Sequence, residues 1–535
     1  MALTDSTNQD FDRPEPREEP ENPGSLRDRL VPPFLGSPLW GWLGPLLVTA
    51  FGAFLRFDRL AVPKAVVFDE TYYAKDALSL ITFGVERTTV KDADKLLLGG
   101  DHNVWQSCAA TELDKCASYV VHPPLGKWLI GVGEWLWGAD PFGWRFAAAV
   151  LGSLSILLVA RVARRMTRST LLGCLAGLLL ALDGLHFVLS RTALLDVFLM
   201  FWVLAGFGCL VVDRDRSRER LARWYEGSSL AGAGPWLGVR PWRIGAGVCL
   251  GAAVATKWSG VFFLVAFAVM SLLWDAGARR AVGLRHPFSG ALRRDVPTAL
   301  AGLGLVPVVV YVASWAGWFA TPYGYGRNWA QATSSGPVYF VLDSMRSWWN
   351  YQSMVLGFHT GLDSSHPYQS EPWEWPLLLR PVAFFYEGPA CNTGKCAQAV
   401  LGVGTPVIWY GSLIALIGLI AWYVATRDWR AGAVLLAYGV GWLPWFYYAI
   451  ADNRTMFLFY TAPMLPFMAI ALALAAGLLI GPAGARQNRR LLGAALSGAF
   501  VLVALINFWW LYPIISAEII PYDDWHRRML FDRWI

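Results

Sequence analysis

The chain has 535 residues, of which 55% are hydrophobic and only 16% are charged. This composition excludes an ordinary soluble protein, because apolar runs long enough to cross about 30 Å of hydrocarbon recur almost from end to end. The net charge of +6 comes with arginines that cluster between those runs. Such clusters are typical of the cytoplasmic loops of membrane proteins, so the charge does not require a nucleic acid partner.

Residues 1–38 contain acidic residues, proline and asparagine and no apolar segment, which predicts a disordered cytoplasmic tail. Residues 39–515 then contain about eleven apolar runs, each close to the length of a membrane-spanning helix. The sequence therefore predicts an all-α polytopic protein embedded among membrane lipids. The runs lie at residues 39–57, 144–163, 171–189, 193–212, 244–257, 259–274, 299–319, 406–425, 432–450, 456–480 and 491–515.

Arginine clusters indicate which connecting segments face the cytoplasm. By alternation from these clusters, two long polar segments at about residues 58–142 and 320–403 lie outside it. A C-terminal tail at residues 516–535 is also external, whereas the N-terminus is cytoplasmic. The expected location is the cell membrane. The clusters lie at residues 161–168, 213–223, 279–294, 427–430 and 486–490.

Four of the seven cysteines fall in the two external segments. Cys108 and Cys116 lie in the first, and Cys391 and Cys396 lie in the second. Disulfides persist in oxidising compartments, so each pair is placed to form a short disulfide-closed loop. Four free thiols are the alternative, because sequence does not fix connectivity.

Two adjacent carboxylates, Asp69 and Glu70, follow the first span among aromatic residues. Burial and like-charge repulsion raise a carboxylate pKa toward the range that suits a general base. The alternative is structural, because an acidic pair before a helix commonly caps its N-terminus.

The run from His122 to Lys127 contains two prolines that fix a rigid helix start. Free N–H groups at a helix N-terminus, together with a lysine or histidine, can bind a phosphate. The alternative is a membrane-entry helix whose lysine extends to the interface.

Charged residues at or inside predicted spans are costly and therefore become functional candidates. Arg145 and Lys257 lie at external span ends, where both can face one aqueous cavity with the acidic pair. Asp183, Arg191 and Asp196 can either contact a ligand or form a structural network of intramembrane ion pairs.

The second external segment is rich in aromatic and histidine side chains. Trp373 and Trp375 offer stacking faces for sugar rings, and His359 and His366 offer hydrogen bonds to hydroxyl groups. A divalent metal site is the alternative, although no nucleotide-binding or zinc motif is present. We therefore expect no metal and no resident cofactor.

These motifs together resemble the protein O-mannosyltransferase family, specifically its bacterial, actinobacterial-type members. The resemblance covers nearly the whole chain after the N-terminal tail. The external segment at residues 320–403 is too short for the lumenal β-trefoil insert of eukaryotic members. The matching motifs are Phe68–Glu70 with Tyr72–Tyr73, His122–Lys127, Gly143–Phe146, Ser190–Asp196, Thr256–Gly260 and His366–Pro381.

The resemblance implies a GT-C glycosyltransferase fold with about eleven spans and an external active site. It implies transfer of mannose from a polyprenyl- or dolichyl-phosphate-mannose lipid to Ser or Thr hydroxyls of secreted polypeptides, with the Sec translocon as a neighbour. Asp69 would be the general base, and Glu70 would help to place donor or acceptor. Arg145 would contact the leaving phosphate. Weaker phosphate candidates are His122, Lys127, Arg191 and Lys257.

This chemistry is consistent with the residues themselves. A lipid phosphate is a good leaving group, so one base and a cationic patch suffice for a single displacement that inverts the anomeric centre. Two alternatives remain. One is a related GT-C transferase that moves another lipid-linked sugar to a lipid or polysaccharide, and the other is a membrane transporter that uses its intramembrane charges as a relay.

Overall fold

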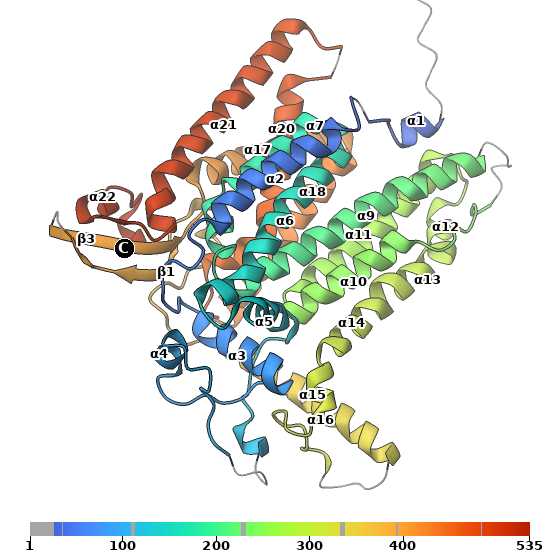
Figure 1. The fold of residues 1–535 in the computed structure, drawn as a ribbon. Coiled ribbons are helices and arrows are strands. Elements are labelled where there is room, and N and C mark those ends of the chain that lie inside the picture. The colour runs from blue at the N-terminus through green and yellow to red at the C-terminus, as the bar shows by residue number, and fades with distance from the viewer. Residues whose placement is uncertain are drawn as a thin grey trace, which may run out of the picture.

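The computed structural model describes residues 26–34, 36–108, 113–225, 232–331, 337–391, 394–482 and 484–535. Long apolar helices run side by side and form the body of the molecule (Figure 1). Within the described ranges, nine helical segments are long and apolar enough to cross a membrane. These segments are Trp40–Phe57, Pro141–Thr167, Leu195–Tyr225, Gly260–Ala281, Val296–Ser314, Pro406–Thr426, Trp429–Ala451, Leu458–Ile480 and Gln487–Ile515.

The two remaining expected runs are helical but shorter. They correspond to α7 (Thr170–Ala181) and α10 (Pro241–Thr256). The expected span at residues 171–189 is broken, because the Asp183 carboxylate accepts a hydrogen bond from the backbone N–H of His186 and so starts a new helix, α8 (Gly184–Leu189). Each expected apolar run thus corresponds to helix, although two of them fall below spanning length.

The long helices carry the following bounds. The first half of the chain contributes α2 (Trp40–Phe57), α6 (Pro141–Thr167), α9 (Leu195–Tyr225), α11 (Gly260–Ala281), α13 (Val296–Ala299), the π-helix η2 (Leu300–Leu305) and α14 (Val306–Ser314). The second half contributes α17 (Pro406–Thr426), α18 (Trp429–Trp442), α19 (Pro444–Ala451), η5 (Leu458–Met464), α20 (Leu465–Ile480) and α21 (Gln487–Ile515).

Helix α9 lies at the centre of the bundle and packs against α6, α10, α11 and η5. Most of its apolar window is buried within the protein, as expected for a helix that is hydrophobic on all sides. Its first residues lie beside the Asp69 segment, and its last turns reach the opposite end of the bundle (Figure 1). The two ends of α9 therefore mark the two faces of the membrane domain.

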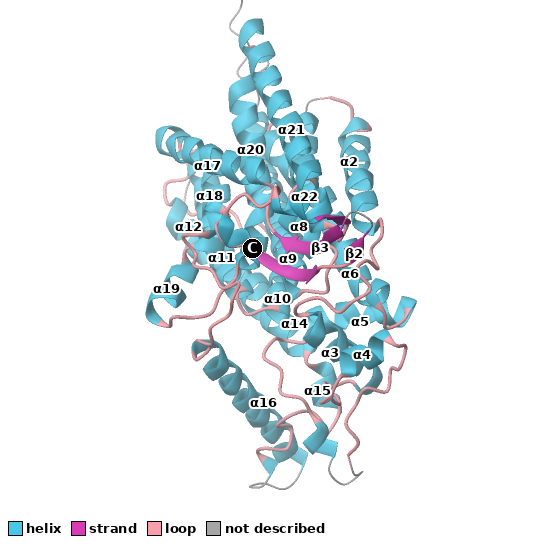
Figure 2. Ribbon diagram, turned by 90° about the vertical axis from the view of Figure 1, so that its left-hand side faces the viewer, coloured by secondary structure: helices cyan, strands magenta, loops and turns pink. Residues whose placement is uncertain are grey.

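The end of the bundle that carries Asp69, called the site face below, holds most of the remaining elements (Figure 1). Helix α16 stands apart from the long helices, as Figure 2 shows. The site-face elements are α3 (Glu70–Phe83), α4 (Ala93–Leu98), η1 (Leu113–Cys116), α5 (Leu125–Trp137), α15 (Ala316–Ala320), α16 (Pro337–Thr360), η4 (Trp375–Leu377), α22 (Tyr522–His526) and η6 (Asp532–Trp534).

A small antiparallel sheet also lies at the site face, so the all-α expectation holds for the membrane helices but not for the whole chain. Its strands are β1 (Val382–Glu387), β2 (Ala390–Cys391), β3 (Gly394–Gly402) and β4 (Ile519–Pro521). Strand β3 pairs with the other three, and the register pairs Val382 with Gly402 and Cys396 with Pro521. Residues 516–535 are therefore part of this structure, because β4 extends the sheet and the buried Trp534 donates to the carbonyl of Leu378.

The expected disorder of residues 1–38 does not extend over that whole segment. Residues 1–25 lie outside the described part of the chain, but α1 (Leu26–Leu30) is a short helix. Its Leu30 packs in a small apolar cluster with Leu221 and Val282, at the end of the bundle opposite the site face. Apolar packing therefore holds this part of the N-terminal segment against the membrane domain.

Candidate active site

Asp69 lies directly before α3 and leaves its carboxylate free of helix capping. It occupies the N-cap position, but its side chain makes no capping hydrogen bond. The preceding Phe68 has a φ of +47°, a left-handed conformation that is uncommon for an aromatic residue. The Phe68 ring holds this turn in place by stacking on Phe384 at 5.0 Å and contacting Phe459 edge-on at 5.7 Å. The structure thus favours a functional role for Asp69 over a capping role.

The surroundings of Asp69 suit a general base. Burial raises its pKa to about 6, while the nearby Lys257 ammonium opposes this rise and Asp196 reinforces it. A carboxyl group with this pKa is mostly ionised at neutral pH and is a better proton acceptor than an ordinary aspartate.

A cavity of about 490 Å³ lies between the α10–α11 connection, α16 and the segment around α19. Asp69 itself does not line this cavity, but Lys257, whose ammonium opposes the rise in the pKa of Asp69, is part of its wall. The wall combines two cations and two histidines with many aromatic and apolar side chains. Its residues include His122, Val254, Lys257, Trp258, Val261, Phe262, Tyr311, Trp348, Gln352, Leu356, His359, Trp445, Tyr448, Arg454 and Tyr460.

Lys257, in the cavity wall, forms an ion pair with Asp196. The Lys257 Nζ donates to both carboxylate oxygens of Asp196 at 2.9 and 3.0 Å. The ammonium also lies 4.7 Å from the centre of the Tyr460 ring. Asp196 therefore orients Lys257, which has one further N–H available to a ligand anion.

Arg454 supplies the second cation. Its guanidinium donates to the backbone carbonyl of His359, and its Nη2 lies 3.3 Å from the His359 Nδ1. Its Nε is buried without a partner among the described residues. A buried, unpaired guanidinium N–H in a cavity wall is a suitable donor to a phosphate oxygen.

Two histidines, His122 and His359, also lie in the cavity wall. The His122 and His359 rings lie 5.3 Å apart, and the Nε2 of His359 lies 2.9 Å from the carbonyl oxygen of Val121. Burial and the nearby positive charges lower the pKa of both rings, that of His359 to about 4. They are therefore neutral at physiological pH and can act as hydrogen-bonding groups. The Nδ1 of His122 is buried and has no partner among the described residues.

Arg145 and Glu70 do not face the cavity, which corrects the roles expected for them. The Arg145 Nε and Nη2 donate to the two oxygens of Glu70 at 2.8 and 2.9 Å. Its other three N–H groups donate to the backbone carbonyls of Leu60, Pro63 and Ala65. With both side chains buried and all five guanidinium N–H groups used, Arg145 has no donor left for a phosphate.

Glu70 instead joins three segments that surround the site. Besides Arg145, it accepts hydrogen bonds from the backbone N–H groups of Val67 and Ala193 at 3.0 and 3.1 Å. It thereby ties the Asp69 turn to α6 and to the segment before α9. All of these contacts join Glu70 to the protein, whereas the Asp69 side chain makes no capping hydrogen bond.

Lys127 and Arg191 are also structural. Lys127 is fully buried and forms ion pairs with Glu86 and, at 3.7 Å, with Asp76. Arg191 donates to backbone carbonyls at the end of α2, including those of Leu55 and Arg56. A cation at a helix C-terminus satisfies the free carbonyls and interacts favourably with the helix dipole. Neither side chain has the position expected of a phosphate ligand.

The candidate aromatic residues of segment 320–403 have mixed positions. Trp375 is buried and donates to the hydroxyl of Ser370 at 3.0 Å, so it belongs to the core and not to a sugar-binding surface. Trp373 is half exposed and contacts Phe446. His366 contacts Phe68 edge-on at 6.1 Å and so lies close to the turn that carries Asp69.

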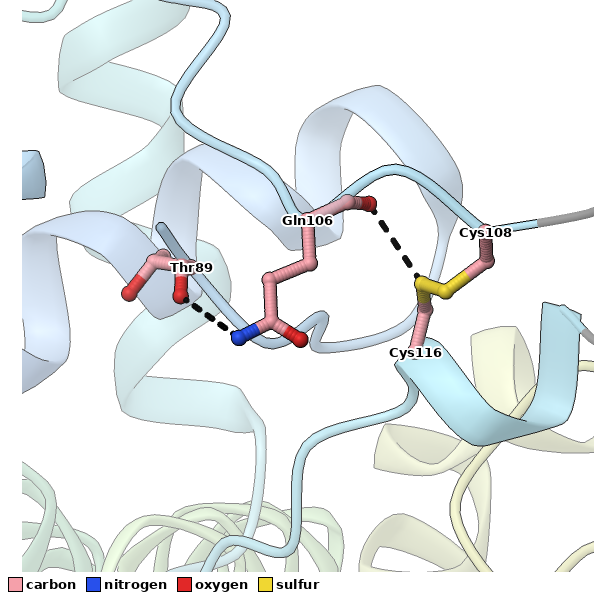
Figure 3. Close-up of a disulfide and its surroundings, with 4 residues drawn as sticks. All are labelled: Thr89, Gln106, Cys108 and Cys116. Carbon is pink, nitrogen blue, oxygen red and sulfur yellow. Dashed lines mark hydrogen bonds between the residues drawn. A yellow bond between two sulfur atoms is a disulfide. The ribbon is translucent and has the colours of Figure 1, made fainter. Parts of the chain in front are cut away.

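Disulfides join the two cysteine pairs identified in the sequence. Cys108 is bonded to Cys116, and the carbonyl of Gln106 lies beside this bond (Figure 3). Cys391 is bonded to Cys396 within the β2–β3 hairpin. Both bonds lie in connecting segments of the site face.

Sequence reasoning missed Arg454 and the aromatic cavity wall. Arg454 lies in a short connection that alternation places outside the cytoplasm, where arginine is uncommon. That exception is a signal from which the residue could have been found. No comparable signal marks Tyr460 or Tyr311, because tyrosines at span ends are common membrane-interface residues.

Comparisons with known proteins agree with this architecture. The family model described as dolichyl-phosphate-mannose-protein mannosyltransferase matches residues 139–313, and that of the C-terminal four TMM region of protein-O-mannosyltransferase matches residues 344–534. The solved S. cerevisiae protein O-mannosyltransferase Pmt1–Pmt2 complex bound to the sugar donor has a TM-score of 0.69, over 95% of this chain and 94% of that chain. At 14% identity this likeness concerns the fold, which is that of a GT-C glycosyltransferase.

Closer relatives are bacterial. A polyprenol-phosphate-mannose–protein mannosyltransferase of Mycolicibacterium smegmatis is 40% identical, over 94% of this chain and 96% of that protein. One from Mycobacterium tuberculosis is 39% identical, over 98% of this chain and 97% of that protein. The chain belongs to the family of polyprenol-phosphate-mannose–protein mannosyltransferases.

Proposed function

We propose that this chain transfers mannose from a polyprenol-phosphate-mannose lipid to Ser and Thr hydroxyls of proteins, with Asp69 as the general base. The observation that carries the assignment of the site is the pairing of an uncapped, desolvated carboxylate with a cavity that contains Lys257 and Arg454. Such a combination can take a proton at one end and hold a phosphate at the other.

The donor phosphate binds between Lys257 and Arg454. These two residues take the phosphate-binding role that the resemblance implies for Arg145. Lys257 has one N–H beyond its ion pair, and Arg454 has its buried Nε–H, so both can donate to phosphate oxygens. His122, as a neutral ring with an unpaired Nδ1, is available to a sugar hydroxyl or a phosphate oxygen. The apolar wall at Val261 and Phe262 leads toward the exposed face of α11 and suits the polyprenyl chain.

The reaction is a single displacement. The acceptor hydroxyl attacks the anomeric carbon of mannose while Asp69 takes its proton, and the bond between that carbon and the phosphate oxygen breaks. The electron pair leaves with the lipid phosphate, whose developing charge Lys257 and Arg454 stabilise. Attack opposite the leaving group inverts the anomeric centre. The step uses no resident metal or cofactor.

The site face is the extracytoplasmic face in this proposal. Arginine clusters at residues 161–168 and 486–490 support a cytoplasmic position for the opposite end, and with it for the N-terminus. The two disulfides at the site face support an oxidising compartment there. Acceptors would then be secreted polypeptides that are still extended as they leave the translocon.

Transfer by the purified protein tests this function. The protein in lipid nanodiscs is incubated with polyprenyl-phosphate-[¹⁴C]mannose and a Ser/Thr-containing peptide, with a matched peptide in which every Ser and Thr is Ala. We expect label on the first peptide alone. NMR then gives the anomeric configuration of the transferred mannose, and inversion is determined by comparison with the configuration in the donor. Label from polyprenyl-phosphate-arabinose at an equal or higher rate, or no label from mannose, would refute the assignment.

A further inference from the structure

A second cavity, of about 250 Å³, lies at the end of the bundle opposite the site face. Four of its residues are on α9, at positions 213, 216, 217 and 220, a spacing that places them on one face of the helix. The first turn of α10 forms the other side. Asp213 lies about 25 Å along α9 from Asp196, and Arg220 about 36 Å. The cavity is therefore at the other membrane interface and separate from the proposed active site.

The charge of this cavity is unbalanced. Asp213, its only acidic lining residue, is paired with Arg240, which also donates to Asp275 at 2.7 Å. Arg216 is exposed, and no hydrogen bond or ion pair joins it to an acidic side chain within the described ranges. Among the residues that the structure describes, the Arg220 guanidinium donates only to the neutral carbonyls of Leu237 and Val239. Two arginine charges thus remain without a counter-charge from the described residues.

The geometry of the cavity suits a phosphate group. Helix α10 begins here with Pro241 and Trp242, so the positive end of a 16-residue helix lies at the same cavity as the arginines. Trp242 is 43% exposed, and the neighbouring Trp236 is 59% exposed. Exposed tryptophans at a span end indicate the level of the lipid headgroups, where an acyl chain can lie along the helix below.

We propose that this cavity binds the phosphate headgroup of an anionic phospholipid from the leaflet opposite the active site. Arg216 and Arg220 donate to the phosphate oxygens, Arg240 is held in place by its two aspartates, and Trp242 packs beside the glycerol region. A basic pocket between membrane helices at the headgroup level is a recurring mode of lipid recognition. The proposal concerns a lipid that stays bound and is independent of the transferred sugar.

Native mass spectrometry of the full-length protein tests the proposal. The protein is released from nanodiscs that contain phosphatidylglycerol and phosphatidylcholine in equal amounts, and the lipids that remain bound are counted. The wild type should retain phosphatidylglycerol preferentially. In the Arg216→Gln/Arg220→Gln variant, the ratio of bound phosphatidylglycerol to bound phosphatidylcholine should fall by roughly thirtyfold. Arg280→Gln, an exposed arginine at the same end but outside the cavity, is the matched control and should behave as the wild type.

Three results would overturn the proposal. The first is a wild type that retains phosphatidylglycerol no better than phosphatidylcholine. This result is obtained with the wild-type protein alone, so it does not depend on whether a variant folds. The second is a double glutamine variant that has unchanged thermal stability and retains phosphatidylglycerol as well as the wild type does. The Arg216→Lys/Arg220→Lys variant, by contrast, keeps both charges and should keep much of the preference for phosphatidylglycerol. The third is stabilisation of the detergent-solubilised protein by millimolar inorganic phosphate but not by phosphatidylglycerol, which would assign the cavity to a soluble anion.

Discussion

Replacing Asp69 by Asn should abolish most transfer and yet stabilise the protein. The asparagine keeps the shape of the side chain but cannot accept the acceptor proton, and loss of a general base typically costs about a hundredfold to ten-thousandfold in rate. Burial raises the pKa of Asp69 from 3.8 to about 6 in the folded protein. Each pKa unit corresponds to about 1.4 kcal/mol, so the ionised carboxylate costs the folded state about 3 kcal/mol at neutral pH.

The sign of this contribution follows from the raised pKa. Between about pH 4 and pH 6 the folded state binds more protons than the unfolded state, so stability falls as pH rises through this window. Asn has no charge to bury and removes the cost above pH 6. The Asp69→Asn variant should therefore unfold at a higher temperature than the wild type at pH 7.5, and at nearly the same temperature at pH 4.

The assay combines single-turnover mannose transfer from saturating donor with donor binding and thermal unfolding. Donor affinity should survive, because the cations and not the carboxylate hold the phosphate. Asp101→Asn, an exposed aspartate on the same segment between α2 and α6, is the control and should change none of the three quantities. Near wild-type transfer by Asp69→Asn would remove Asp69 from the mechanism, and a lowered unfolding temperature would show that its charge is structural.

Three further predictions follow from the same geometry. The rate of wild-type transfer should fall about tenfold per pH unit below pH 6, because Asp69 becomes protonated. A rate that is constant down to pH 5 would contradict a role for Asp69 as a base with a pKa of about 6. Arg454→Gln should weaken donor binding by about tenfold to a hundredfold, the value of a charged hydrogen bond; unaltered donor affinity would exclude the contact. Arg145→Met should destabilise the protein by about 3–5 kcal/mol because it leaves Glu70 buried and unpaired, and wild-type stability with reduced donor affinity would restore Arg145 as a ligand.

The sequence predicts the membrane helices, the two long polar segments and the importance of the Asp69 turn. Span prediction succeeds because a lipid-facing segment must be apolar over a fixed length, which is a local property of the chain. It fails in detail at residues 171–189, where Asp183 finds a capping partner that breaks the helix. The sheet was not predicted, because one of its strands comes from residues 519–521, more than 100 residues after the others.

The partners of the buried charges could not be predicted. Glu70 and Arg145 are 75 residues apart, and Arg191 reaches carbonyls more than 130 residues away. A charged residue at a membrane level signals that it has a partner, but the sequence does not say whether the partner is protein or ligand. Lys127 shows the same ambiguity, since its position at a helix start fits a phosphate site although its actual partner is Glu86.

The central claim is that the donor headgroup lies in the cavity between Lys257 and Arg454, next to Asp69. Photocrosslinking with a polyprenyl-phosphate-mannose analogue, with a diazirine on the sugar, tests this most directly. After irradiation of the protein in nanodiscs and peptide mapping, label should appear within residues 67–73, 254–262, 348–360 and 454–460 and should be displaced by excess natural donor. Displaceable label found instead at residues 213–242, or on no segment of the cavity wall, would contradict the assignment.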